Sequence, residues 1–70
     1  NSGSSLCDLA DLDALSGNLS GAEKWLERSI RDCPNFTQGW EFMAKLQTHL
    51  GNKERAAACQ KKVAALAAGG

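Results

Sequence analysis

The sequence predicts an all-α fold of four antiparallel helices, arranged as two stacked helix–turn–helix hairpins. The first observation is a repeated turn, because Gly17-Asn18 returns as Gly51-Asn52 after 34 residues, the length of one common helix–turn–helix repeat. The second is that glycine at both positions can adopt the left-handed conformation that ends a helix. The third is that apolar residues recur at helical spacing on both sides of each turn.

The first helix is expected to begin at Ser4 or Ser5, either of which can act as its N-cap. Gly17 ends it. Four apolar residues form its predicted core stripe: Leu6, Leu9, Ala10 and Leu12.

The second helix is expected to begin at Ser20, with Glu23 completing a capping box. Pro34 stops it and disfavours a helical conformation at the preceding residue. Trp25 allows two interpretations, because it either packs between the two hairpins or stands partly exposed as an anchor for a partner. The inward and lateral positions of this helix are Ala22, Trp25, Leu26, Ser29, Ile30 and Cys33.

The third helix is predicted to start after an Asn35 cap, with Gln38 in the reciprocal position, and to end at Gly51. Gly39 inside it costs about 1 kcal/mol relative to alanine, which indicates that another element packs closely there. Its inward positions are Trp40, Met43, Ala44, Gln47 and Leu50, and Trp40 is expected to lie in the core.

The fourth helix is predicted from about Lys53 to Ala67, with Asn52 able to act as its cap. It is rich in alanine, which favours a helix but buries little surface per residue. The tail 68–70 is expected to be disordered.

Composition and charge narrow the range of functions that the chain could have. The chain has 70 residues, 43% of them hydrophobic, so it predicts one small domain with a modest core. The formal net charge is zero, so no general attraction to nucleic acid or to an anionic membrane is implied. Charge is uneven, because residues 1–35 carry a net charge of −3 and residues 36–70 a net charge of +3.

The cysteines and the histidine do not form a recognisable metal-binding or catalytic motif. The three cysteines, Cys7, Cys33 and Cys59, form no C-x-x-C pair, and His49 is the only histidine. A structural zinc site needs four ligands at short spacings, so we expect buried structural thiols, no metal, no cofactor and no enzyme activity. An odd number of cysteines favours a reducing compartment such as the cytoplasm. No stretch approaches the roughly 18 apolar residues of a membrane span.

The 34-residue correspondence continues outside the turns: Leu6 matches Trp40, Leu9 matches Met43, Ala10 matches Ala44, and Leu12 matches Leu46. Together with Ala22, Ala56 and the closing Pro34, this pattern resembles the tetratricopeptide repeat (TPR) family. The resemblance implies a single domain of residues 1–70, an α-α superhelix with repeats at about 3–36 and 37–70. The chain departs from the family pattern at Asp13 and Gln47, where the family has an aromatic residue, and at Gln60.

The resemblance implies a non-catalytic module that binds a partner peptide or helix in the groove lined by the first helix of each repeat. The residues mapped onto that groove are Cys7, Asp8, Asp11, Gln38, Glu41, Lys45 and Thr48. Their acidic members favour a basic protein or peptide as the partner.

A structural or assembly role is the alternative, because a repeat array usually needs three units or a capping helix. Ala57, Ala64 and Ala68 would then form the self-association face of the fourth helix. This face would be covered by a second copy of the chain or by neighbouring repeats of a longer chain. Copies could stack head to tail, acidic end on basic end, or pair through their fourth helices, and the sequence leaves both geometries open.

Overall fold

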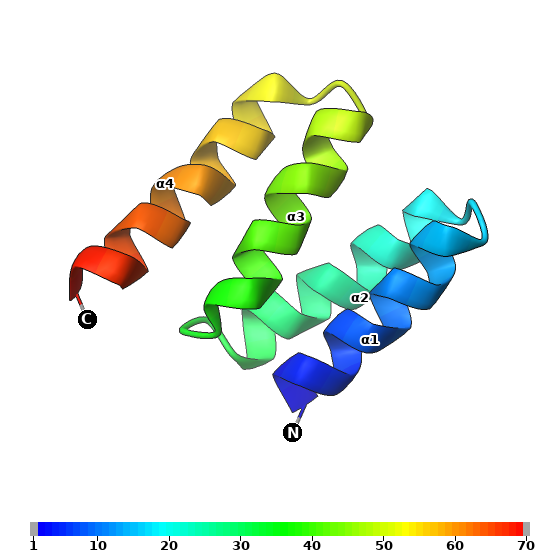
Figure 1. Cartoon of the computed structure of the whole chain (residues 1–70), viewed down its shortest axis with the longest axis horizontal. Helices are drawn as coiled ribbons and strands as arrows, with labels where there is room; N and C mark the ends of the chain where they lie inside the picture. The colour runs from blue at the N-terminus through cyan, green and yellow to red at the C-terminus, as the bar shows by residue number, and fades with distance from the viewer. Residues whose placement is uncertain (1, 70) are drawn as a thin grey trace.

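The computed structural model describes residues 2–69, and this part of the chain is helical apart from three short connections. The helices are α1 (Ser2–Leu15), α2 (Leu19–Asp32), α3 (Thr37–His49) and α4 (Lys53–Gly69). No strand occurs in the described residues. The predicted all-α fold of four helices is therefore confirmed (Figure 1).

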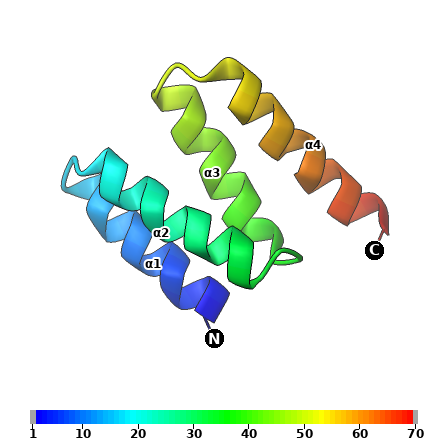
Figure 2. The same ribbon diagram turned by 180° about the vertical axis from the view of Figure 1, so that it is seen from behind.

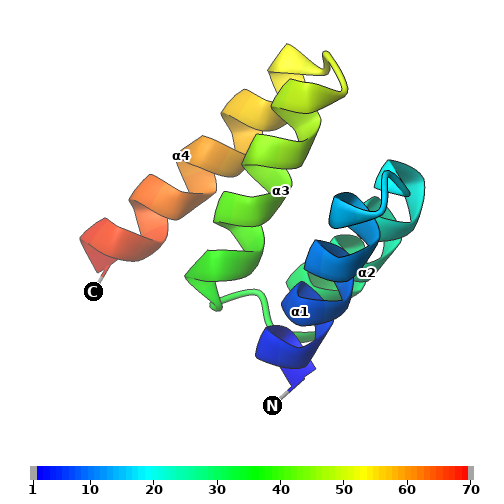
Figure 3. The same cartoon turned by 45° about the vertical axis from the view of Figure 1, so that its right-hand side comes forward.

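The helices form two hairpins, α1 with α2 and α3 with α4. The α3 helix packs against both helices of the first hairpin, whereas within residues 2–69 the backbone of α4 approaches only α3. Figure 2 shows the same order from behind, and Figure 3 shows α3 between the first hairpin and α4. The molecule is flat, with extents of 34 × 29 × 15 Å. This arrangement makes α3 the centre of the fold.

Both predicted glycine turns are confirmed. Gly17 and Gly51 have φ angles of +88° and +82°, in the left-handed region that only glycine adopts without strain. In each turn the amide of the residue after the glycine donates to a carbonyl five residues earlier, at 2.8 Å in the first turn and 2.9 Å in the second. The two turns therefore end α1 and α3 with the same hydrogen-bonded motif.

The predicted capping box of α2 is wrong. The helix begins at Leu19, and its N-cap is Asn18, whose side chain accepts a hydrogen bond from the Gly21 amide at 3.2 Å. Ser20 thus lies inside the first turn. The Glu23 carboxylate turns away from the helix start and binds Gln47 of α3.

The predicted caps of α1 and α3 also differ from the structure. The α1 helix already includes Ser2, so Ser4 and Ser5 lie within it. The N-cap position of α3 is held by Phe36, without a side-chain hydrogen bond, and not by Asn35. Asn52 directly precedes α4, in the position predicted for its cap, and its side chain donates to Gln47 Oε1 at 2.9 Å.

The α4 helix is longer than predicted. It continues through Ala68 to Gly69, so the expectation of disorder at these two residues is wrong. Alanine has the highest helix propensity, and a run of alanines extends the helix once it has started. Gly70 lies outside the described residues.

The core lies where α1, α2 and α3 meet, and α4 adds two residues to it. Its buried apolar members are Leu6, Cys7, Ala10, Ala22, Leu26, Met43, Ala44, Leu46, Ala56 and Cys59. The predicted inward face of α2 is confirmed, with Ala22, Leu26 and Ser29 fully buried. Small residues at many of these positions let the helices approach closely.

The predicted core stripe of α1 is only half right. Leu6 and Ala10 are buried, but Leu9 is 39% exposed and Leu12 is 64% exposed. The reason is that α2 and α3 cover one side of α1 and leave its other side open. Leu50, predicted to face inward at the end of α3, is also 38% exposed.

The two hairpins approach each other closely at Gly39. A Cβ atom at this position would lie 3.0 Å from Ser29 Oγ of α2, tighter than ordinary van der Waals contact. The predicted close packing at Gly39 is confirmed, and it explains why glycine occupies this position inside α3.

Both tryptophans pack beside the core. Trp25 is half-buried against it, and its indole N–H donates to Asp13 Oδ2 of α1 at 3.0 Å, a hydrogen bond within the first hairpin and not between the two. Trp40 is also half-buried, which is less than expected of a core residue. Its indole N–H donates to the Pro34 carbonyl at 2.7 Å, and Lys62 Nζ lies 5.7 Å from its ring centroid.

Candidate functional site: two grooves along the third helix

A shallow cleft crosses the junction of the two hairpins, with a volume of about 350 Å³. Its lining residues, which we call the A-helix cleft, are Asp11 of α1 and Gln38, Glu41, Phe42 and Lys45 of α3. The structure therefore brings together four of the seven residues predicted to bind a partner. Asp11, Glu41 and Lys45 line the cleft and are exposed, so solvent reaches these charged residues.

The prediction that Cys7 lines the partner-binding groove is wrong. Its side chain is only 2% exposed, and its Sγ lies 3.9 Å from Ser29 Oγ inside the core. Cys7 shares the buried face of α1 with Ala10, one helical turn later. Asp8 is exposed but does not line the cleft, and Thr48 lies in a different groove.

A larger groove of about 540 Å³ runs between α3 and α4. We call it the α3/α4 groove; its lining residues are Glu41, Ala44, Lys45, Thr48, His49, Gln60 and Val63. Sequence reasoning missed its α4 wall, Gln60 and Val63. The repeat offset carries the signal, because these residues stand 34 positions after Leu26 and Ser29, which bury the equivalent surface of α2.

The alanines predicted for self-association, Ala57, Ala64 and Ala68, are exposed on α4. They do not line the α3/α4 groove. They thus lie on a separate surface, whose role stays a prediction.

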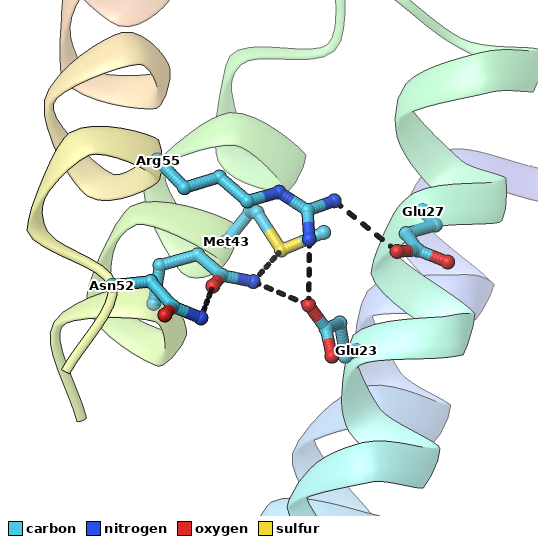
Figure 4. Close-up of polar contacts among 6 residues, drawn as sticks. Glu23, Glu27, Met43, Asn52 and Arg55 are labelled. Atoms are coloured by element: carbon cyan, nitrogen blue, oxygen red, sulfur yellow. Dashed lines mark hydrogen bonds and ion pairs between the residues drawn. The ribbon is translucent and has the colours of Figure 1, made fainter. Parts of the chain in front are cut away.

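A polar cluster joins the two hairpins (Figure 4). Gln47 of α3 is completely buried, and its Nε2 donates to Glu23 Oε2 of α2 at 2.7 Å and to Met43 Sδ at 3.3 Å. Its Oε1 accepts from Asn52 Nδ2 at 2.9 Å. Every hydrogen-bonding atom of this buried amide thus has a partner, as burial of a polar group requires.

Arg55 of α4 completes the cluster. Its Nη1 donates to Glu23 Oε2 at 2.9 Å and its Nη2 to Glu27 Oε2 at 3.1 Å. These are the ion pairs that tie α4 to α2. Because the Arg55 side chain is 49% exposed, solvent and salt screen both pairs, so their contribution to stability is modest.

Burial lowers the reactivity of two of the three thiols, Cys7 and Cys59. Burial raises the pKa of the Cys7 thiol; the hydrogen bond with Ser29 opposes this shift and the Asp8 charge adds to it. Burial also raises the pKa of the Cys59 thiol, partly opposed by Arg55. Since the thiolate is the reactive form, both groups are poor nucleophiles. No cluster of three or more metal-ligating side chains forms within residues 2–69.

We expect Cys33 to react with iodoacetamide well before Cys7 and Cys59 in the folded protein. Cys33 is half-buried, whereas the other two are at most 5% exposed and react only when the structure opens locally. Mass spectrometry of peptides from a time course measures the order. In urea all three should react at similar rates, and equally fast reaction of Cys7 in the folded chain would contradict the buried position.

Comparison of the chain with protein-family models, with curated proteins and with solved structures finds no match. None of the helices in residues 2–69 is long and apolar enough to cross a membrane.

Proposed function

We propose that this chain is a non-catalytic protein–protein interaction module of the TPR type, which binds a partner peptide or helix in the A-helix cleft. The observation that carries the proposal is the cleft itself. One hairpin contributes Asp11 and the other contributes Gln38, Glu41 and Lys45, so the binding surface depends on the stacking of the two units.

The charges of this surface favour a basic partner. Asp11 and Glu41 line the cleft, and the exposed Asp8 lies one helical turn before Asp11. Lys45 is the one basic residue lining the cleft. A ligand carrying lysine or arginine gains attraction and orientation from this arrangement.

Two observations support a non-catalytic role. The buried thiols are expected to react poorly, and the sequence contains a single histidine. The odd number of cysteines supports a reducing compartment such as the cytoplasm.

Two amphipathic peptides of equal length and identical apolar face, one with lysine and one with glutamate on the polar face, test the proposal. In NMR titrations of the isotope-labelled chain, we expect the lysine peptide to shift the amide signals of Asp11, Gln38 and Lys45. The glutamate peptide should leave them in place. Equal shifts with both peptides, or none with either, would contradict a basic partner in this cleft.

Asp11→Asn is the matched variant, because Asp11 is exposed and the change keeps its size. It should weaken binding of the lysine peptide by up to about fivefold, the range for one exposed ion pair. Asp32→Asn, an exposed change at the far end of α2, should leave binding unchanged.

The alternative function is assembly, in which the chain stacks on another helical unit. The specific observation in its favour is the exposure of Leu9 and Leu12, since large apolar side chains side by side on one helix face are typical of an interaction surface.

A further inference from the structure

The repeat offset shows that α1 carries an uncovered copy of the face that α3 buries. Met43 and Leu46 of α3 are 1% and 2% exposed and belong to the core shared with the first hairpin. Their counterparts 34 residues earlier are Leu9 and Leu12, which are 39% and 64% exposed. Leu9 and Leu12 are therefore placed like the packed side chains of α3, but within the described residues no helix covers the side of α1 that carries them.

The opposite end of the molecule carries the matching surface. The α3 helix rests on a floor of four buried residues from α1 and α2: Cys7, Ala10, Leu26 and Ser29. Their counterparts in the second hairpin are Glu41, Ala44, Gln60 and Val63. All four line the α3/α4 groove. The groove is thus the repeat equivalent of the surface that holds α3.

We infer that a second copy of this chain docks its α1 leucines, Leu9 and Leu12, in the α3/α4 groove, head to tail and in the register of the intrachain junction. This inference specifies the partner for the assembly function and does not depend on peptide binding in the A-helix cleft. Each added copy exposes a new groove, so the contact is heterologous and the assembly grows with concentration.

Charge favours a second copy as the occupant. The only charged residues of α1 are three aspartates, whereas α4 carries four basic residues and Glu54. In the intrachain junction Gln47 meets Glu23; the counterpart contact brings Asp13 to Ala57, which has Lys53 and Lys61 one turn away on either side. The net-acidic α1 therefore approaches the net-basic α4, as electrostatic complementarity requires.

The same correspondence indicates a contact weaker than the intrachain one. The Arg55 ion pairs with Glu23 and Glu27 have no counterpart, because position 21 holds glycine. Glu41 and Gln60 also replace the apolar Cys7 and Leu26 on the groove floor. Association is therefore expected to become visible only as the protein concentration rises.

Pairing of two fourth helices about a two-fold axis is the competing geometry. It brings Lys61 and Lys62 close to their mates, and like charges at such a contact are unfavourable. It also leaves Leu9 and Leu12 in water. The head-to-tail geometry covers these leucines and opposes unlike charges.

The first test is sedimentation over a concentration series with Leu12→Glu and Leu15→Glu. Leu15 is 78% exposed, more than Leu12, but its counterpart His49 is not a core residue. We expect Leu12→Glu to raise the apparent Kd at least about tenfold, as loss of a buried leucine implies, and Leu15→Glu to change it little. Equal weakening by both variants, or a wild-type monomer at every concentration, would overturn the proposal.

The second test fixes the register by cross-linking. A Cβ at Gly39 would lie 3.8 Å from Ser29 Cβ, a spacing that a disulfide accepts. The counterpart pair is Ser5 of one copy and Val63 of the next. Mixing Ser5→Cys with Val63→Cys under oxidation should give a covalent dimer that neither variant gives alone.

Ala64→Cys alone is the control for two-fold pairing of α4. In the same oxidation assay it should form no covalent dimer, and neither should the wild-type chain with its three native cysteines. A covalent Ala64→Cys dimer, or no dimer in the mixed sample, would overturn the head-to-tail register. Leu12→Glu should still bind the lysine peptide at Asp11, which separates failure of assembly from failure of peptide binding.

Discussion

Leu26→Ala is expected to lower the free energy of unfolding by about 2–5 kcal/mol, the range for truncating a buried leucine. Leu26 is completely buried in the core between α1, α2 and α3. Small neighbours such as Ala10 and Ala22 cannot move far enough to fill the cavity. A domain of this size has little stability to spare, so the variant should be partly unfolded at room temperature.

Urea denaturation followed by circular dichroism measures this loss. Leu15→Ala is the matched control, because Leu15 is 78% exposed and also lies on a helix; it should change the free energy of unfolding by less than about 0.5 kcal/mol. Similar losses in the two variants would mean that Leu26 is not at the centre of the core.

Gln47→Ala is expected to cost about 1–3 kcal/mol, because it leaves polar groups without their partners in a partly buried place. Gln47 is completely buried and holds Glu23 of α2 and Asn52 after α3 at the same time. Truncation therefore loosens the junction of the hairpins and the turn that begins α4.

Gln38→Ala serves as the control on the same helix, because Gln38 is exposed. It should be nearly neutral in the same urea experiment. A double-mutant cycle of Gln47→Ala with Glu23→Ala should give a coupling energy of at least about 0.5 kcal/mol, as expected of residues in contact. A coupling near zero would mean that the bond between them does not stabilise the junction.

The helices were predictable because a local signal with a clear physical meaning marks each turn. Gly17 and Gly51 end helices in a conformation that other residues avoid, and the 34-residue offset ties the two turns together. The exact start of α2 was not predictable in the same way. Asn18 and Ser20 are both good caps, and the hydrogen bonds of the preceding glycine turn decide in favour of Asn18.

Burial was harder to predict than helicity. The periodicity of α1 correctly predicts that Leu6 and Ala10 are buried, but it cannot show that the side carrying Leu9 and Leu12 is left uncovered. The A-helix cleft was largely predicted because the repeat places α1 beside α3. Cys7 was misplaced because a small rotation about the helix axis separates the cleft from the core.

The polar cluster and the α3/α4 groove were missed for a different reason. Gln47 and Glu23 are 24 residues apart, and no spacing rule within one helix brings them together. Their contact depends on how the second hairpin lies on the first. The same dependence hides the α4 wall of the groove, Gln60 and Val63, until the two units are compared position by position.

The placement of α4 has a consequence for cooperativity. Within residues 2–69 its backbone packs only along α3, and among these residues only Arg55 ties it by ion pairs to the first hairpin. The segment after Gly51 can therefore detach while α1, α2 and α3 keep most of their core, so the chain has a partly unfolded state below the energy of global unfolding. That state has no α3/α4 groove. Any occupant of the groove consequently binds only the closed form and holds α4 in place by mass action, which couples folding of the last helix to assembly.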